Sequence, residues 1–377
     1  MRIAFYAPLK SPDHVVPSGD RTVARLILRA LRKAGHSVDI ASRQRTFDGG
    51  GDEARQERIR LAGERLATRY VDRIRAAPPD LWFTYHLYHK APDWIGHRVA
   101  AAFGIPYVVA EASYAPKQTG GPWDTGHRAV AAALKEAARV ISLNPADTGC
   151  LADLLGSEAR IAPLDPFLDT GPPGRAAARR ESLRAELAAE LDIDPQVCWF
   201  AATAMMRPGD KLASYRLLGE ALRRLEARPW VLLVVGDGEA RAEIEQALDF
   251  PGRVRYLGRL DRKGMDNLHA AADIGVWPAI NEAYGMALLE ARAAGLPLVA
   301  GDRPGVRRVV RGGETGLLAP EGDPVAFAER ITWLLDRPER INEMRIMSLN
   351  TIAKEHNLTQ AARKLDDILR DAARAAE

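Results

Sequence analysis

Two glutamates, Glu282 and Glu290, stand on either side of a glycine in the segment NEAYGMALLE, which spans 281–290. A strand-like stretch, IGVWPA, precedes this segment, and the helical residues ARAAG come after it. We therefore expect a helix that starts near Tyr284 or Gly285. The free N–H groups at a helix start attract phosphate, and a glycine there lets the phosphate reach the backbone. The amides of Tyr284, Gly285 and Met286 thus form a candidate phosphate site.

The two carboxylates complement such a site, because a carboxylate accepts hydrogen bonds from neighbouring hydroxyls. Glu290 lies about a turn and a half inside the expected helix, where it could meet a ribose diol. Glu282 precedes the helix and could meet hydroxyls on the far side of the phosphates. The segment therefore predicts a ligand with hydroxyls on both sides of a diphosphate, which is a nucleotide sugar. The simpler alternative is a pair of surface acids, one of them favoured by the helix dipole.

Positive charge for a diphosphate is available after another predicted strand, VCWFAATA. The loop after this strand carries Arg207 and Lys211. Arginine grips two phosphate oxygens at once, and lysine acts as a point charge. The alternative is a solvated turn. A glycine turn, VGDGEA with Gly236, comes after the next strand but lacks the third glycine of a dinucleotide fingerprint, so it could also be a plain turn.

Strand-like and helix-like segments alternate twice along the chain, and this pattern predicts the scaffold. The first series includes RIAFYAP, HSVDIAS, LWFTYH, YVVAEA and RVISLN, and the second includes WVLLVVGDG, RVRYLG, PLVAG and TGLLAP. A proline- and glycine-rich stretch at about 163–175 separates the two, and an Ala/Arg/Glu-rich helix is expected at 176–191. The fold class is therefore α/β, with two Rossmann-like doubly wound domains. We expect them to face each other across a cleft that holds the substrate, since ligands bind beyond the carboxyl ends of the strands.

Composition sets broad limits on function. The 377 residues are 47% apolar and 27% charged, with a net charge of +3, so no nucleic-acid partner is expected. Cys150 and Cys198 show no metal or redox spacing, which is typical of a reducing cytoplasm. The N-terminus lacks the features of a signal peptide, and no stretch approaches the roughly 20 apolar residues of a membrane span. We expect a soluble, cytoplasmic protein.

Together these motifs resemble the retaining, GT-B-fold glycosyltransferases of family 4, also called glycosyl transferases group 1. The Glu-x7-Glu block NEAYGMALLE is the most recognisable segment of that family. PLVAGDRPGVRRVVRGGETGLLAPEGD resembles the strand, loop and helix on the C-terminal side of the block, and RVRYLGRL and IGVWPA resemble the family's segments on its N-terminal side. The resemblance is strong from about 195 to 330. In the first half of the chain it extends only to the pattern of strands and helices.

The resemblance implies roles for the matched positions in the second half. Glu290 would bind the donor ribose, and Glu282 with the helix amides would hold the sugar and diphosphate. Arg207 and Lys211 would neutralise the leaving diphosphate. The family usually has a Gly-Arg pair after the strand and a lysine slightly farther on. Here Met206 precedes Arg207 and the spacing is shorter, so Lys211 carries over less securely than Glu290.

Two further segments would contact the nucleotide, and three segments of the first half would contribute to the site. The base would rest near VGDG, with Gly236, and near YLGRL, with Leu260. The family has a glycine-bearing loop after the first strand, and PSGDRT with Gly19 fits that place. It also tends to place a histidine after the fourth strand, for which DLWFTYHLYHK offers His86 and His89. His86 is preferred because it closes its strand, although a structural histidine is the alternative. EASYAPKQTGGPW (111–123) suits an acceptor loop or an ordinary connection.

The resulting hypothesis is a metal-independent, retaining glycosyltransferase with catalytic residues His86, Arg207, Lys211 and Glu282. The donor would be a UDP-, GDP- or ADP-sugar, with no cofactor. The acceptor would belong to cell-envelope polysaccharide, lipid-linked or other glycoconjugate synthesis, and a peripheral contact with the inner face of the membrane is compatible with this. We expect an acceptor-side domain at 1–168, a donor domain at 169–350, and a helical segment at 351–377 packed on the first domain. A nucleotide-sugar 2-epimerase and a non-catalytic binding protein are the alternatives.

Overall fold

The chain folds into two compact units in the computed structural model, which describes residues 1–16, 18–282 and 285–375. The first unit comprises Met1–Asp165 with Leu358–Glu377, and the second comprises Pro166–Asn357. The chain thus passes between units after Asp165 and again after Asn357, whereas the sequence analysis placed these boundaries at 168 and 350. Within the described residues, no helix is long and apolar enough to cross a membrane.

The first unit contains a parallel six-stranded sheet with strand order β2-β1-β3-β4-β5-β6. Its strands are β1 (Arg2–Tyr6), β2 (Ser37–Ser42), β3 (Leu81–Leu87), β4 (Tyr107–Ala112), β5 (Arg139–Ser142) and β6 (Ile161–Pro163). Its helices are α1 (Gly19–Lys33), α2 (Glu53–Ile74), α3 (Gly96–Phe103), the 3-10 helix Pro116–Gln118, α4 (Asp124–Glu136), α5 (Pro145–Leu155) and α15 (Leu358–Arg374). The sequence analysis missed β6, a three-residue strand that begins just before the proline-rich stretch and ends inside it.

Helices cover both faces of this sheet, which explains its almost continuous apolar strands. Phe5 and Phe83 stack on one face with ring centroids 5.6 Å apart. Tyr6 and Trp82 belong to the opposite face, whose core includes residues of α2, α3, α4 and α5. Successive residues of a strand point to opposite faces, so one run of apolar residues fills two cores.

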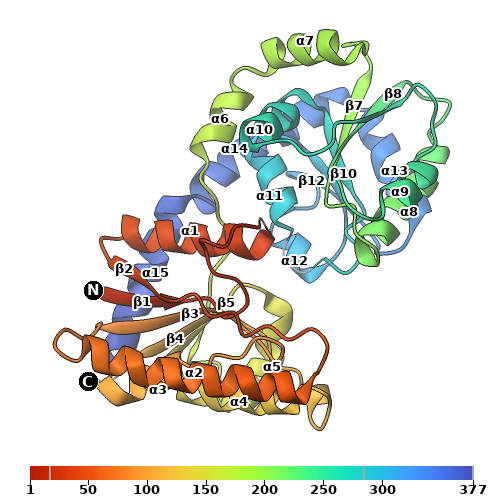
Figure 1. The fold of residues 1–377 in the computed structure, drawn as a ribbon. Coiled ribbons are helices and arrows are strands. Elements are labelled where there is room, and N and C mark those ends of the chain that lie inside the picture. The colour runs from red at the N-terminus through yellow and green to blue at the C-terminus, as the bar shows by residue number, and fades with distance from the viewer. Residues whose placement is uncertain (17, 283–284, 376–377) are drawn as a thin grey trace. The chain divides into compact units, whose positions relative to one another are not determined.

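Helix α15 completes the first unit from the far end of the sequence by packing against α1 (Figure 1). An ion pair of Arg139 with Asp371 and a polar contact of His36 with Asp366 accompany this packing, and burial lowers the pKa of His36, which favours its neutral form. The Nε2 atom of His36 lies 3.2 Å from Asp366 Oδ1, and Arg139 Nη2 lies 2.5 Å from Asp371 Oδ2. The apolar stripe of α1 is therefore covered by residues that come after the whole of the second unit.

The second unit contains another parallel six-stranded sheet, with order β12-β11-β10-β7-β8-β9. Its strands are β7 (Cys198–Thr203), β8 (Trp230–Val235), β9 (Val254–Tyr256), β10 (Ile274–Trp277), β11 (Leu298–Gly301) and β12 (Gly316–Ala319). Its helices are α6 (Gly171–Ala177), α7 (Arg180–Leu191), α8 (Asp210–Arg223), α9 (Arg241–Ala247), α10 (Arg262–Ala271), α11 (Met286–Ala293), α12 (Pro304–Arg307), α13 (Pro324–Leu335) and α14 (Pro338–Glu355).

The expected helix at 176–191 is wrong in its start and its continuity. A short helix, α6, begins at Gly171 within the proline-rich stretch, and α7 begins separately at Arg180. Prolines occupy the first turn of α6. They are tolerated there because the first N–H groups of a helix have no partner within the helix. The proline signal therefore marked a helix start, and the sequence analysis took it for an unstructured linker.

Strand order reverses once in each sheet, and these points are where doubly wound sheets bind ligands. In the first unit the reversal lies between β1 and β3, and in the second between β7 and β10. The predicted fold class of two doubly wound α/β domains is confirmed. Between the ends of these four strands and the first turns of the helices after them lie Gly19, His86, Arg207, Lys211, Glu282, Gly285 and Met286.

Candidate functional site

The helix expected after IGVWPA is α11, and it begins at Met286. Gly285 is its N-cap residue, with φ 69° and ψ 36°. This left-handed conformation favours glycine, and no side-chain oxygen caps the helix start. The first amides of α11 therefore have the chemistry of an anion site, as predicted for Gly285 and Met286. Tyr284 lies outside the described residues.

The loop before α11 is held in an uncommon backbone conformation by a polar network. Ala279 and Asn281 have φ values of 56° and 50°. Such residues cost on the order of 1–3 kcal/mol and persist where the surroundings hold them. The Asn281 amide donates to Asp210 at 3.0 Å and accepts from Arg303 at 3.1 Å. Glu321 accepts from the Asn281 N–H at 2.7 Å and from Arg303 at 2.8 Å. The first residue of α8 and the loops after β11 and β12 thus fix the loop that carries Glu282.

Lys211 and Glu282 form an ion pair across the reversal point of the second sheet. Lys211 Nζ lies 2.5 Å from Glu282 Oε2, and the two side chains are 30% and 19% exposed. Lys211 comes from the first turn of α8, after β7, and Glu282 comes from the loop after β10. Lys211 Nζ also lies 5.3 Å from the centroid of the Trp277 ring. The structure therefore places a partly buried cation and anion at the position where this fold binds ligands.

Arg207, the other predicted cation, is arranged differently. Its side chain is exposed on the loop between β7 and α8. In the part of the chain that the structure describes, its guanidinium makes no hydrogen bond or ion pair. Its backbone is ordered, since the N–H of Leu212 donates to the Arg207 carbonyl at 3.1 Å. The structure thus brings Lys211 to Glu282 and leaves the Arg207 side chain in solvent.

Glu290 pairs with an arginine that the sequence analysis did not consider. Arg262, the first residue of α10, donates from Nη1 to Glu290 Oε1 at 2.6 Å. Its Nε lies 3.1 Å from Oδ1 of the buried Asp266, one turn farther along α10. Burial raises the pKa of the Glu290 carboxyl above its usual range, and the Arg262 charge opposes that shift. Glu290 thus belongs to a charged chain between α10 and α11, separate from the pair of Glu282 with Lys211.

Gly236 and Leu260 lie close to one another, but Gly236 also has a packing role. The N–H of Gly236 donates to the carbonyl of Gly258, two residues before Leu260, at 2.9 Å. A Cβ atom on Gly236 would stand 1.9 Å from the Ala204 carbonyl oxygen, and its φ is 145°. A glycine is therefore required there whether or not a nucleotide binds. The contact of these residues with a donor base stays a prediction.

In the first unit, Gly19 and His86 lie on the two sides of the reversal point. Gly19 opens α1, and a Cβ atom there would meet nothing within 4 Å. His86 lies at the end of β3, the third strand of the chain, and has φ 62°. Its Nδ1 atom lies 2.9 Å from Asp20 Oδ1. Each unit thus carries a basic and an acidic side chain in contact across its reversal point.

Carboxylates surround His86 and favour its protonated form. Burial opposes protonation, but Glu111, Asp20 and Asp147 together raise the pKa of His86 above its ordinary value. Burial likewise opposes ionisation of Asp20, yet the hydrogen bond and charge of His86 hold the pKa of Asp20 below its usual range. Burial raises the pKa of Asp147. The three carboxylates therefore favour a protonated His86 that can donate hydrogen bonds at this edge of the sheet.

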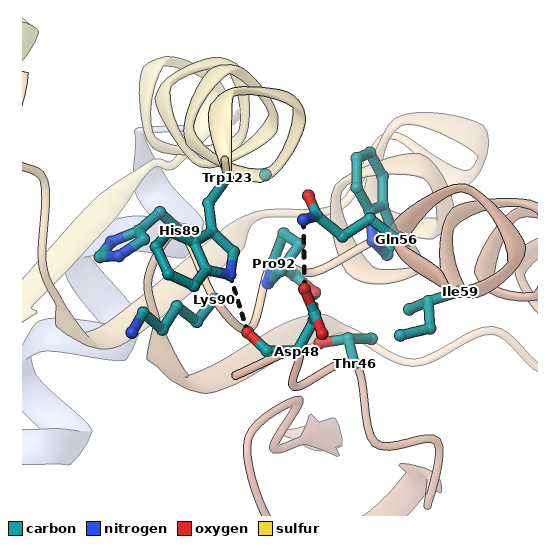
Figure 2. Close-up of a pocket in the computed structure, with 10 residues that line it drawn as sticks. Thr46, Asp48, Gln56, Ile59, His89, Lys90, Pro92 and Trp123 are labelled. Atoms are coloured by element: carbon teal, nitrogen blue, oxygen red, sulfur yellow. Dashed lines mark hydrogen bonds between the residues drawn. The ribbon is translucent and has the colours of Figure 1, made fainter. Parts of the chain in front are cut away.

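His89 lies elsewhere, beside a small enclosed cavity in the first unit (Figure 2). The buried Asp48 holds this region together, accepting from Gln56 at 3.1 Å through its carboxylate and from Trp123 Nε1 at 2.8 Å through its carbonyl. Lys90 Nζ lies 4.1 Å from the centroid of the Trp123 ring. The cavity volume of about 10 Å³ holds one water molecule and no sugar. This end of the predicted acceptor loop 111–123 is therefore packed against the protein.

Comparison with known proteins identifies the second unit. Residues 200–337 match the family model described as Glycosyl transferases group 1. This segment of the second unit is therefore similar to the glycosyl transferases group 1 family. The matched segment contains Arg207, Lys211, Glu282 and Glu290.

Curated relatives of the chain agree with this similarity. It is 41% identical over 105 residues, or 28% of each chain, to phosphatidyl-myo-inositol mannosyltransferase of Mycobacterium leprae. The chain spans 28%, 38%, 48% and 50% of the lengths of the first four curated relatives that it matches.

Solved structures show that the whole chain has the GT-B fold of glycosyltransferases. A glycosyltransferase of Rickettsia africae matches with a TM-score of 0.76 at 15% identity, over 98% of both chains. Anabaena HepE in complex with UDP-glucose matches with a TM-score of 0.69 at 16% identity, over 98% of this chain and 99% of that chain. The predicted resemblance to this family and fold is confirmed.

Sequence reasoning missed the residues of the second unit that support its charged groups. These are Arg262, Asp266, Asn281, Arg303 and Glu321. Asn281 stands directly before Glu282 and could have been singled out for its tolerance of positive φ. Nothing in the sequence signals that Arg262 meets Glu290, because the contact depends on how α10 packs beside α11.

Proposed function

We propose that this chain is a retaining glycosyltransferase that moves a sugar from a nucleoside diphosphate to an acceptor hydroxyl. The observation that carries the proposal is the Lys211–Glu282 pair beside the uncapped start of α11, at the reversal point of a sheet from the glycosyl transferases group 1 family. A cation and free amides suit a diphosphate, and a carboxylate suits sugar hydroxyls. The complex of Anabaena HepE with UDP-glucose supports a nucleotide-sugar donor.

In this proposal the bond between the anomeric carbon and the diphosphate breaks as the acceptor oxygen bonds to the same face of that carbon. Negative charge develops on the leaving diphosphate, where Lys211, Arg207 and the start of α11 stabilise it. The leaving phosphate takes the acceptor proton, so no protein nucleophile is required. These charged groups are in place before the reaction, which is what makes electrostatic stabilisation effective.

His86 would serve the sugar or the acceptor from the first unit. Its ring can donate a hydrogen bond to a ligand, and the contact with Asp20 would fix its orientation. The space beside Gly19 leaves the backbone at the start of α1 accessible to a ligand. Phosphatidyl-myo-inositol mannosyltransferase, by its name, glycosylates a lipid-linked inositol, which supports a lipid-linked acceptor as one class to test.

The first experiment is a thermal-shift screen with UDP-, GDP- and ADP-sugars, each with and without a chelator. A ligand that binds the native state raises Tm. At a concentration 100-fold above Kd, it adds about 2.7 kcal/mol to the free energy of unfolding. We expect one base to give a clear shift that the chelator leaves unchanged. Loss of the shift with chelator would contradict metal independence. The absence of a Tm shift with every donor would contradict the proposed donor site.

A second proposal concerns the membrane, because one face of α2 is basic. Arg58, Leu61, Arg65 and Arg69 are partly or fully exposed at helical spacing along α2. Among the described residues, none of these three arginines forms an ion pair. Each arginine near an anionic surface contributes about 1 kcal/mol. We expect the protein to co-sediment with vesicles that contain phosphatidylglycerol and to leave pure phosphatidylcholine vesicles unbound. Replacing the three arginines with glutamine should abolish this binding, and equal binding of the variant would contradict the proposal.

A further inference from the structure

We propose that Arg262 is a positioning residue that fixes the ionisation and orientation of Glu290 for the ribose of the donor. This inference rests on the proposed donor site. It adds to that site a residue that lies 28 positions before Glu290 and on a different helix.

The first observation is that Arg262 contacts two carboxylates at once. Its Nη1 donates to Glu290 Oε1 at 2.6 Å, while its Nε lies 3.1 Å from Asp266 Oδ1. Asp266 is one turn farther along α10 and only 4% exposed, so it anchors the guanidinium on its own helix. The planar fork of arginine can hold both contacts, whereas an ammonium group is a single point of charge.

The second observation concerns what remains available on Glu290. Arg262 occupies Oε1, and Oε2 has no hydrogen bond within the described residues. The Glu290 side chain is 23% exposed, so a ligand can reach it. Arg262 thus leaves one carboxylate oxygen free and fixes the plane in which it points. Arg262 itself is 45% exposed, which places this chain of charges at the surface of the unit.

The third observation is that the positive charge of Arg262 favours the ionised form of Glu290. Burial raises the pKa of its carboxyl, and Asp266 raises it further, while Arg262 is the charge that lowers it. Around Asp266, Asp169 adds negative charge and Arg175 adds positive charge from the stretch that includes α6. A carboxylate accepts hydrogen bonds from a diol more strongly than a neutral carboxyl group does. Loss of Arg262 should therefore weaken ribose binding most at acidic pH.

The test is isothermal titration of the full-length protein with UDP, GDP and ADP between about pH 5.5 and pH 8. We expect Arg262→Ala to weaken binding of the preferred diphosphate about tenfold more at the acidic end than at the basic end, because the charged hydrogen-bond acceptor is lost at acidic pH. Arg262→Lys should restore part of the affinity at acidic pH. Lys263→Ala, which removes a charge from the neighbouring position on the same helix, should bind like the wild type.

The outcomes separate a failure of this inference from a failure of the proposed function. If the wild type binds a diphosphate and Arg262→Ala weakens it equally at every pH, or leaves it unchanged, the role of Arg262 is wrong. If the wild type binds none of the three, the donor site itself is wrong and the inference falls with it. A ligand without the 2′-hydroxyl, dTDP, should show most of the Arg262→Ala penalty removed. An undiminished penalty with dTDP would mean that Arg262 acts on another part of the nucleotide.

Discussion

Replacing Lys211 with alanine should lower kcat for sugar transfer by about 10²–10³-fold, the effect of removing one preorganised group that stabilises developing charge. Lys211 Nζ lies at the reversal point of the second sheet, and Glu282 holds it there at 2.5 Å. In the proposed donor site, the oxygens of a diphosphate would compete with Glu282 for the ammonium. Glu282 would then be released toward the hydroxyls of the sugar. The measurement is the steady-state rate with the donor that the thermal-shift screen identifies.

The same substitution should change stability little. Partly exposed ion pairs contribute about 0–1 kcal/mol, so Tm should fall by no more than a few degrees. Arg216→Ala is a matched control, because Arg216 is an exposed cation on the same helix, α8. It should retain wild-type turnover. A variant of Lys211 that loses Tm and keeps its turnover would show that the pair is structural.

Replacing Glu290 with alanine should weaken donor binding by about 10- to 150-fold. Hydrogen bonds to a charged group contribute about 1.5–3 kcal/mol, and each 1.4 kcal/mol is tenfold in Kd. The prediction concerns the nucleotide, so UDP, GDP and ADP should show the loss as clearly as the complete donor. Titration calorimetry measures it directly. Glu220→Gln, at an exposed position of α8, is the control that should bind normally.

Although Glu290 should strengthen donor binding, its ionised carboxylate should lower the stability of the protein at neutral pH. Its raised pKa means that the native state binds this proton more tightly than the unfolded state does. The contribution of Glu290 to the free energy of unfolding therefore falls as pH rises from the ordinary value of 4.5 through the folded pKa. Glutamine carries no such penalty. Glu290→Gln should thus match or exceed the wild-type Tm at neutral pH while binding the donor more weakly. A fall in Tm together with normal binding would mean that Glu290 serves the fold.

Much of the scaffold could be predicted from the sequence because parallel strands with helices on both faces leave a repeating signal. Runs such as WVLLVV (230–235) are fully buried, and glycines such as Gly35 come just after the ends of helices. The start of α11 was also predictable, since a glycine between a strand and an apolar helix marks an N-terminus. β6 was missed because three residues are too few to show a periodic pattern of apolar residues. α6 was missed because its prolines were interpreted as a linker.

The partners of the candidate residues were not predictable in the same way. That Glu282 meets Lys211 depends on strand order, since β7 and β10 are neighbours in the sheet although two strands separate them in sequence. That Glu290 meets Arg262 depends on the side-chain rotamers of two packed helices. The surroundings of His86 depend on Glu111 and Asp147, which come from β4 and α5. No local sequence pattern predicts these contacts between distant residues.

The place of α15 also determines when the protein can finish folding during its synthesis. The second unit is one continuous segment, so its residues are all available once Asn357 has left the ribosome. The first unit is not continuous: its sheet is translated early, yet the part of α1 that packs against α15 stays uncovered until Leu358–Arg374 emerges. The half that is made first is therefore completed last. During that interval α1 is the surface that a chaperone would have to shield.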